Sequence, residues 1–253
     1  MLIWGIWKKT TNLMTTNNAV LITAAGSSLR FGRKKEYLRL PEYAETQTTV
    51  LSASVYAFAV SGQFRFFVIT VPEGDEDATA AMLAEDSKLT EFLRNFQHRL
   101  FIVSGGSTRQ ESVYKGLTVL AEKVPDNIAF VLVHDGARPW VSSQVITDVL
   151  KAAEQHGAAV PVIPVVDTQK EIDKEGKIIR HLDRQRIAAV QTPQGFLFNQ
   201  LLAAHRSARY DGSTYTDDSE IYAAYCAPVY TCQGMRSNKK ITYPEDRANI
   251  PHH

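Results

Sequence analysis

The chain has 253 residues, of which 44% are hydrophobic and 22% are charged, so it can bury a core and does not have the composition of a disordered chain. Lys plus Arg total 28 and Asp plus Glu total 27, and the formal net charge of +1 excludes a globally basic nucleic-acid-binding protein. Two cysteines exclude a disulfide scaffold, and no apolar run approaches the roughly 18 residues of a membrane span. We expect a globular, cytoplasmic protein with no nucleic-acid or membrane partner.

The N-terminal segment does not have the pattern of a signal peptide, because its two lysines follow the apolar residues instead of preceding them. The first regular element is predicted to begin at about Ala19. We therefore expect residues 1–18 to form a loosely ordered tail and residues 19–253 to form a single domain.

Apolar runs alternate with segments of helical spacing along the next part of the chain. Strands are predicted at 19–24, 65–71, 100–103, 130–134 and 158–166. Helices are predicted at 50–59, within a polar stretch that ends near 98, at 111–121, and from Ser142 or Ser143 to Gly157. This alternation predicts an α/β fold with a mostly parallel sheet flanked by helices.

The alternation stops over residues 167–192, where a turn at 174–177 separates two polar, moderately β-prone stretches. This segment has too little apolar content for a core of its own. We expect residues 167–192 to form a projecting β-arm that packs against another part of the assembly, such as a second subunit. Helical patterns resume at 196–209 and 217–225, followed by a strand near 229–232.

The loop after the first predicted strand combines small and basic residues. In open α/β sheets ligands bind beyond the carboxyl ends of the strands. The small residues from Ala24 to Ser28 would let backbone N–H groups approach a phosphate, and Arg30, Arg33, Lys34 and Lys35 add positive charge. The loop fits neither the Walker A pattern nor G-x-G-x-x-G. A flexible turn beside a solvated basic run explains it equally well.

A glycine pair, Gly105 and Gly106, directly follows the third predicted strand. Such a pair permits the close approach of a nucleoside base or ribose. Thr108 and Glu111, a little further on, have the spacing of a capping box, so the start of a helix explains them.

The fourth predicted strand runs into His134 and Asp135, with Arg138 three residues later. The carboxylate and the guanidinium could hold ribose hydroxyls, a metal or a phosphate, or could form a structural salt bridge at a tight turn. We expect His134 to be an ordinary buried histidine. The segment from Thr216 to Ser219 is mainly typical of a helix N-cap.

Taken in order, these segments resemble the 2-C-methyl-D-erythritol 4-phosphate cytidylyltransferase family, from Ala19 to about Asn249. The matching motifs are Ala24-Ala25-Gly26 with Arg30 and Lys35-Glu36-Tyr37; Gly105-Gly106 with Arg109-Gln110-Glu111-Ser112; His134-Asp135-Gly136-Ala137-Arg138-Pro139; Asp167-Thr168; Asp183-Arg184; Gln191-Thr192-Pro193-Gln194; Thr216-Asp217; and Lys240-Ile241-Thr242.

The resemblance implies a Rossmann-like fold of the nucleotide-diphospho-sugar transferase type and a homodimer whose exchanged arms complete each partner's site. The implied reaction joins CTP and 2-C-methyl-D-erythritol 4-phosphate, releases pyrophosphate and belongs to non-mevalonate isoprenoid biosynthesis. Because two anions must meet, catalysis would rest on positioning and charge neutralisation. Mg²⁺ would be held mainly by the CTP phosphates, with no metal ligand from the protein.

The resemblance also implies the roles of individual residues. Arg30 and Lys35 would stabilise the pentacoordinate α-phosphate, while Lys240 and Arg184 of the partner subunit would orient the sugar phosphate. The nucleotide would be bound by Ala24, Ala25, Gly26, Ser28, Gly105, Gly106, Ser112, Asp135 and Gly136. The acceptor pocket would be lined by Arg138, Thr168, Thr192 and Thr216.

Three positions depart from the family pattern. The segment between Arg30 and Lys35 is short, with Lys34 where the family has Pro; Glu36 replaces Gln; and Gly136 replaces Ala. The alternative functions are a ribitol 5-phosphate cytidylyltransferase and a non-catalytic nucleotide-binding regulator. An NAD-dependent oxidoreductase is disfavoured, because the third glycine of its motif is missing.

Overall fold

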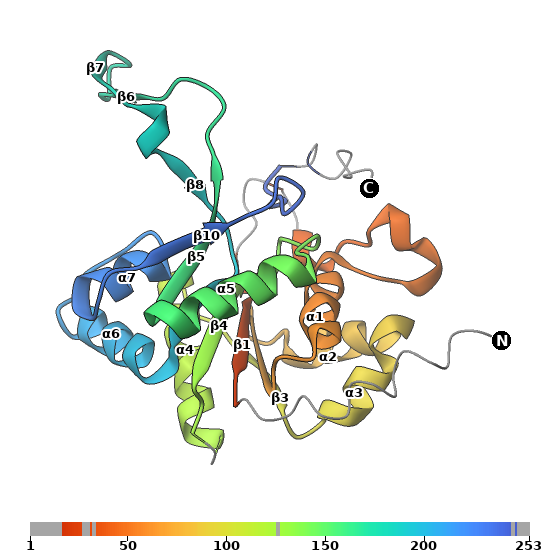
Figure 1. The fold of residues 1–253 in the computed structure, drawn as a ribbon. Coiled ribbons are helices and arrows are strands. Elements are labelled where there is room, and N and C mark those ends of the chain that lie inside the picture. The colour runs from red at the N-terminus through yellow and green to blue at the C-terminus, as the bar shows by residue number, and fades with distance from the viewer. Residues whose placement is uncertain (1–16, 27–30, 32–33, 125–126, 244–245, 247–253) are drawn as a thin grey trace.

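The computed structural model describes residues 17–26, 31, 34–124, 127–243 and 246. Its main element is an eight-stranded sheet in the order β10-β5-β9-β4-β1-β2-β3, with β8 paired to β5 (Figure 1). The strands are β1 (Ala19–Thr23), β2 (Phe66–Val71), β3 (Leu100–Ser104), β4 (Phe130–Asp135), β5 (Ala158–Pro164), β8 (Ala188–Val190), β9 (Gln194–Leu197) and β10 (Tyr230–Gln233). The helices are α1 (Val50–Ser61), α2 (Glu76–Glu85), α3 (Thr90–Phe96), α4 (Arg109–Lys123), α5 (Ser143–His156), α6 (Phe198–Tyr210) and α7 (Asp218–Tyr225). The predicted α/β fold is confirmed.

Helices cover both faces of the sheet, and each face has its own apolar core. Val20 and Ile22 of β1 face the core formed with α1, α2, α3 and α5, whereas Ala19 and Leu21 face the core formed with α4, α6 and α7. All four side chains are fully buried. This two-sided burial explains why the central strands are continuous apolar runs instead of alternating patterns.

The order in which strands are added to the sheet reverses at β1. β2 and β3 extend the sheet on one side of β1, and β4 pairs with β1 in parallel on the other side. Thr23 is in register with both Thr70 of β2 and Asp135 of β4, so the strand ends meet at one edge. An open α/β sheet binds its ligands at such a topological switch point.

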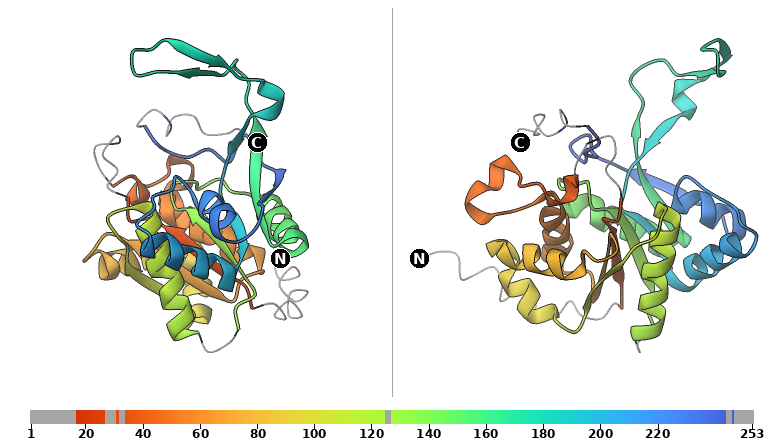
Figure 2. Two further views of the ribbon diagram at one scale, coloured as in Figure 1. Left: turned by 90° about the vertical axis from the view of Figure 1, so that its left-hand side faces the viewer. Right: turned by 180° about the vertical axis from the view of Figure 1, so that it is seen from behind.

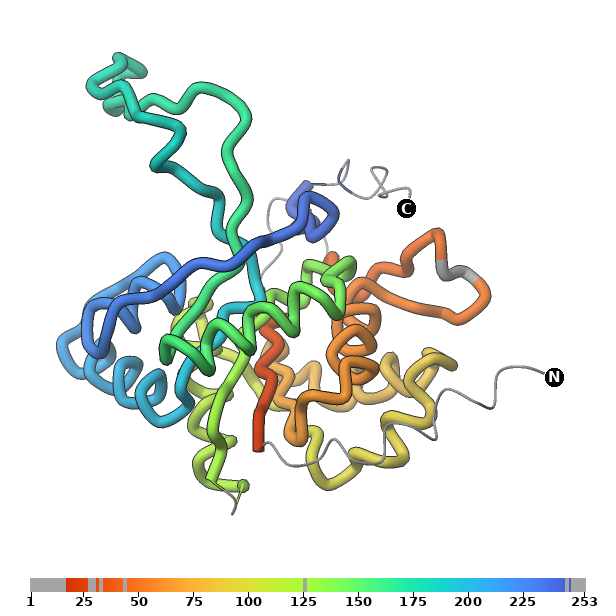
Figure 3. Tube along the Cα trace, viewed as in Figure 1, coloured from red at the N-terminus to blue at the C-terminus, as the bar shows by residue number. Residues whose placement is uncertain are grey.

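The segment between β5 and β9 projects from the body of the molecule (Figures 1 and 2). Its stem is the antiparallel pairing of β5 with β8, and its tip is a hairpin of β6 (Lys170–Ile172) and β7 (Ile178–His181). Ile172, Ile178 and Ile179 at the tip are at least half exposed in the single chain. Beyond the stem, β10 runs past the base of this arm before the chain continues into residues 234–243 (Figure 3).

Two expectations from the sequence are wrong. The helix predicted from Phe196 begins at Phe198, because Gln194–Leu197 is strand β9, antiparallel to both β4 and β5. Asn18 is not part of a loose tail: it is fully buried, and its carbonyl accepts the N–H of Arg65 at 2.9 Å. Residues 1–16 lie outside the described part of the chain.

Candidate active site at the switch point

The loops after β1, β3 and β4 meet at the carboxyl edge of the sheet. The N–H of Gly136 donates to the Thr23 carbonyl at 2.9 Å, and that of Gly105 donates to the Val71 carbonyl at 2.7 Å. A Cβ at Gly105 would lie 2.3 Å from Ala25 Cβ, so the first and third loops touch there. The predicted nucleotide-binding segments around Ala25, Gly105 and Gly136 are therefore brought together.

The glycine loop after β3 is held by the first turns of α4. The N–H of Gly106 donates to the Ser112 hydroxyl at 3.0 Å, and Lys115 Nζ donates to the Gly105 carbonyl at 2.7 Å. The Ser112 hydroxyl in turn donates to the Thr108 carbonyl at 2.9 Å. The absence of a side chain at Gly105 thus has a structural reason, contact with Ala25, in addition to the predicted approach of a nucleotide.

The capping box predicted for α4 is half formed. Thr108 is the N-cap, and its hydroxyl accepts the N–H of Glu111 at 3.1 Å. The Glu111 carboxylate does not return to Thr108 but accepts the N–H of Ser107 at 2.8 Å and its hydroxyl at 2.9 Å. These bonds lower the pKa of Glu111. Glu111 therefore fixes the loop one residue earlier than a capping box would.

Asp135 ends β4 with its carboxylate almost completely buried among three cations. Lys240 Nζ lies 2.9 Å from Oδ2, Arg138 Nε 3.6 Å from Oδ2, and Arg109 Nε 3.3 Å from Oδ1. Burial alone would raise the pKa of Asp135, but the three cations outweigh it and hold the pKa well below its usual range. The predicted pair of Asp135 and Arg138 is present, within a larger cluster.

Arg109 connects this cluster to α7. Its Nη1 lies 2.7 Å from Oδ2 of Asp218, whose Oδ1 lies 3.1 Å from His205 Nε2, and both of these side chains are fully buried. Burial alone would lower the pKa of Arg109, but Asp218 and Asp135 raise it above its usual value. Sequence reasoning gave Arg109 no role and read Asp218 as a capping-turn residue. Only contacts between residues 109 positions apart show the link.

A chain of hydrogen bonds holds the backbone of Asp135 in place. Its N–H donates to Thr192 Oγ1 at 3.1 Å, and Thr192 Oγ1 lies 3.1 Å from His134 Nδ1. His134 Nε2 lies 3.2 Å from the Arg138 carbonyl, which can only accept, so the neutral ring carries its proton on Nε2 and accepts from Thr192. Burial lowers the pKa of His134 to about 3. His134 is thus a satisfied buried histidine, as expected.

Arg138 and Thr192 both hold protein groups in this structure. Arg138 Nη1 donates to the Asn238 carbonyl at 2.8 Å, its side chain is 12% exposed, and burial lowers its pKa. The Thr192 hydroxyl is engaged by His134 and Asp135. Their predicted contact with the acceptor stays a prediction.

The two lysines of the loop after β1 are placed differently. Lys34 forms an ion pair with Asp75, and Tyr37 donates to the same carboxylate at 3.2 Å. Lys35 begins the 3-10 helix Lys35–Tyr37; its side chain is 12% exposed, and its Nζ lies 4.0 Å from a Glu36 carboxylate oxygen. The Lys35 side chain therefore lies largely inside the protein, whereas that of Lys34 is half exposed.

The remaining predicted site residues are not in the cluster. Thr168 and Arg184 are exposed on the projecting arm, and Thr216 is exposed beside α7, where its hydroxyl donates to Glu220 Oε2 at 2.9 Å. Ala24 is buried below the edge, and a Cβ on Gly26 would meet no atom within 4 Å. Ser28, Arg30 and Arg33 lie outside the described residues.

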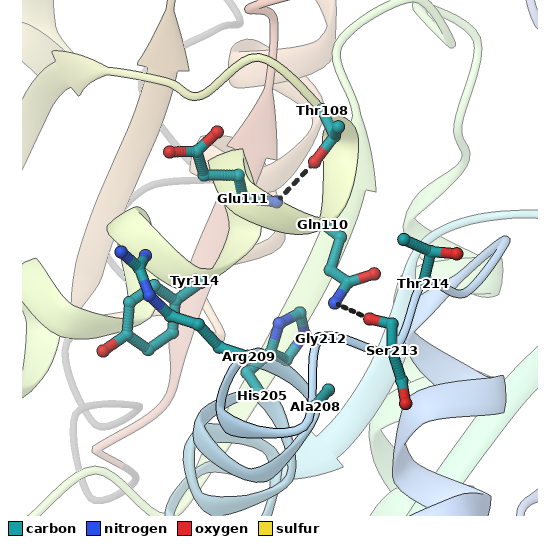
Figure 4. A pocket seen from close by; sticks show the side chains of 10 residues that line it. All are labelled: Thr108, Gln110, Glu111, Tyr114, His205, Ala208, Arg209, Gly212, Ser213 and Thr214. Carbon is teal, nitrogen blue, oxygen red and sulfur yellow. Dashed lines mark hydrogen bonds between the residues drawn. The ribbon is translucent and has the colours of Figure 1, made fainter.

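A cavity of about 350 Å³ lies beside the cluster, between α4, α6 and residues 212–214 (Figure 4). Gln110, one of its lining residues, donates to the Ser213 carbonyl at 3.0 Å, and the Arg209 guanidinium lies over the Tyr114 ring. Thr108 and Glu111, at the start of α4, also line it. None of the predicted site residues is among those that line this cavity.

Within the described residues, no group of three or more His, Cys, Asp or Glu side chains is placed to hold a metal ion. Asp135, the carboxylate at the strand end, has both oxygens next to cations. This donor set suits an anion better than a resident metal. None of the helices in the same part of the chain combines the length and apolar character that a membrane crossing needs.

Comparison with known proteins shows the family of the chain. The model of the 2-C-methyl-D-erythritol 4-phosphate cytidylyltransferase family matches residues 18–250. A protein of that name from Desulforamulus reducens is 35% identical over 91% of this chain and 92% of its own length, and one from Bacillus cereus is 34% identical over 90% and 93%. A Rhodopseudomonas palustris protein, "Bifunctional enzyme IspD/IspF", is 38% identical over 90% of this chain and 53% of its own.

Solved structures show the same likeness. The 2-C-methyl-D-erythritol 4-phosphate cytidylyltransferase of Thermus thermophilus superposes with a TM-score of 0.68 at 31% identity, covering 90% of this chain and 94% of its own. A synthase from Anaerococcus prevotii superposes with a TM-score of 0.74 at 24% identity, covering 92% and 95%, and adds evidence for the fold alone. The chain belongs to the 2-C-methyl-D-erythritol 4-phosphate cytidylyltransferase family.

Proposed function

We propose that this protein transfers the cytidylyl group of CTP to 2-C-methyl-D-erythritol 4-phosphate and releases pyrophosphate, as a step of isoprenoid biosynthesis. Family membership supports the proposal. The observation that carries it is the meeting of the glycine loop with Lys240, Arg109 and Arg138 around Asp135 at the switch point. Small residues give a nucleotide access there, and cations face the place where anions must meet.

The reaction needs no nucleophile from the protein. An oxygen of the acceptor phosphate attacks the α-phosphorus of CTP, and the bond to the leaving pyrophosphate breaks. The protein's task is to align the groups and to neutralise charge, which suits a site rich in fixed cations. In this proposal Lys35 and Arg30 stabilise the α-phosphate, and Lys240 orients the acceptor. A Mg²⁺ ion would be held mainly by the CTP phosphates and would shield their charge.

The proposal includes a cytoplasmic homodimer. Thr168 and Arg184 are exposed on an arm that extends from the body, and apolar isoleucines are exposed at its tip. An arm of this kind gains from packing on a second copy, which would bury those isoleucines. Arg184 of the partner subunit would then complete the acceptor site.

Turnover with different acceptors tests the function. The protein is incubated with CTP and Mg²⁺ and with either 2-C-methyl-D-erythritol 4-phosphate or ribitol 5-phosphate, and pyrophosphate release is measured. We expect release with the first acceptor. Release with ribitol phosphate alone would favour the related cytidylyltransferase, and CTP binding without release would favour a regulator.

Two adjacent lysines offer a matched test of the catalytic role. Lys35→Met should lower kcat by about 10²–10³-fold, because it removes a charge that stabilises the transition state. Lys34→Met should lower kcat far less, since Lys34 is paired with Asp75. Equal losses in the two variants would contradict the assignment of Lys35.

A further inference from the structure

Lys240 belongs to a segment with no regular secondary structure to fix its position. Residues 234–243 follow β10 and contain no helix or strand. Yet Lys240 Nζ lies 2.9 Å from Asp135, although its side chain is 38% exposed. A flexible lysine on irregular backbone is held only as well as that backbone is held. Something outside the segment must therefore fix it.

The side chain of Gln191 does this with all of its polar groups. Its Nε2 donates to the carbonyls of Met235 at 2.9 Å and Asn238 at 3.2 Å, and its Oε1 accepts the N–H of Met235 at 3.2 Å. Gln191 is 5% exposed, and its own N–H donates to the Pro161 carbonyl of β5 at 2.8 Å. A buried amide from the base of the arm thus fixes two points of the segment.

Gly234 provides the space for this contact. A Cβ at Gly234 would lie 2.6 Å from Gln191 Oε1 and 3.0 Å from the Val162 carbonyl oxygen. The N–H of Gly234 donates to that carbonyl at 2.9 Å, so its backbone is not free to move away. Any side chain there would push the Gln191 amide out of place.

Further bonds carry the constraint from Gln191 to Lys240. Asn238 is fully buried, its Nδ2 donates to the Thr192 carbonyl at 2.8 Å, and its own carbonyl accepts from Arg138 as well as from Gln191. The N–H of Ile241 donates to the Ala137 carbonyl at 2.9 Å. Lys240 is thus bracketed by two residues that are tied to the loop after Asp135.

We propose that Gln191 is a positioning residue that holds Lys240 at Asp135 by fixing the backbone of residues 235–238. The expected kinetic effect rests on the proposed function, in which Lys240 orients the acceptor phosphate. The structural effect does not, because it concerns the place of Lys240 in the free protein.

The rate at which acetic anhydride acetylates Lys240 in the native protein, followed by mass spectrometry, measures how firmly its amine is held at Asp135. Gln191→Met keeps a side chain of similar size but has no amide, and we expect Lys240 to react several-fold faster. Gly234→Ala, which leaves Gln191 itself unchanged, should do the same. The control Gln144→Met, which removes a surface glutamine bonded to Asp148 on α5, should react at the wild-type rate. Unchanged rates in both Gln191→Met and Gly234→Ala would overturn the inference.

Steady-state kinetics supply the second measurement. Gln191→Met should raise the KM for 2-C-methyl-D-erythritol 4-phosphate about tenfold and leave the KM for CTP within about twofold. Faster acetylation with both KM values unchanged would overturn the positioning role. If the wild-type protein shows no turnover, the proposed function fails, and the acetylation rates alone decide whether Gln191 holds Lys240.

Discussion

At the scale of single residues, the unusual feature is Asp135, one carboxylate surrounded by three cations. Each of its oxygens is within 3.6 Å of a cationic nitrogen. The carboxylate therefore holds the three positive groups close to one another at the sheet edge. Without it, Arg109, Arg138 and Lys240 would repel one another. The charge that the proposed anionic substrates need is thereby held in place before they bind.

The ion pair of Arg109 with Asp218 can be tested by unfolding. Arg109→Met leaves Asp218 buried with only His205 beside it, and we expect a loss of about 3 kcal/mol in the free energy of unfolding. Asp218→Asn should cost a similar amount. The double variant should lose at least about 1 kcal/mol less than the sum, because the two groups interact directly. Additive losses in urea titrations would contradict that coupling.

His134 makes stability depend on pH. Its pKa is about 3 in the folded protein and about 6.5 when unfolded, so below pH 6.5 only the unfolded chain takes up its proton. The contribution of His134 to the free energy of unfolding is therefore present above pH 6.5 and is lost as the pH falls toward 3, by about 1.4 kcal/mol per unit. Urea titrations between pH 7.5 and 5 measure this slope. His134→Gln should have a shallower slope by that amount, and an unchanged slope would refute the assignment.

At the scale of elements, the sequence predicted what burial on both faces of the sheet dictates. Continuous apolar runs marked β1, β2 and β4, and a Ser cap with a closing Gly157 marked α5. Strand β9 was missed because its four residues run directly into α6 and pair only with strands distant in sequence. The contacts of Gln191 and Arg109 were missed for the same reason: their partners are more than 25 residues away.

The contact between the loops after β1 and β3 predicts a position that accepts no side chain. Gly105→Ala would place a Cβ 2.3 Å from Ala25 Cβ and 2.8 Å from Ser112 Oγ. The loops must separate, so we expect a loss of about 1–3 kcal/mol in unfolding free energy and a higher KM for CTP. Gly26→Ala, with no atom within 4 Å, should unfold at the wild-type denaturant midpoint. Equal midpoints for both variants would show that the loops are not in contact.

At the scale of the whole molecule, the near-neutral net charge conceals an uneven distribution. The formal charge is +1, yet Arg109, Arg138 and Lys240 converge at the switch point, where Asp135 and Asp218 are the buried carboxylates. Arg184 belongs to the segment between β7 and β8, on the arm that projects from the body of the molecule (Figure 1). In the proposed dimer the second copy would bring that guanidinium to the cluster, so the proposed activity and the proposed dimer are linked.

Mixing two inactive variants tests this dependence. Lys240→Ala and Arg184→Ala should each have little activity as homodimers. In a mixed dimer, one site combines an intact Lys240 with an intact Arg184 from the other chain, while the second site lacks both. Activity should therefore reappear when the variants are mixed under conditions that exchange subunits, and should peak at equal amounts. Mixtures that stay inactive at every ratio, although mass spectrometry shows mixed dimers, would mean that the arm does not act across subunits.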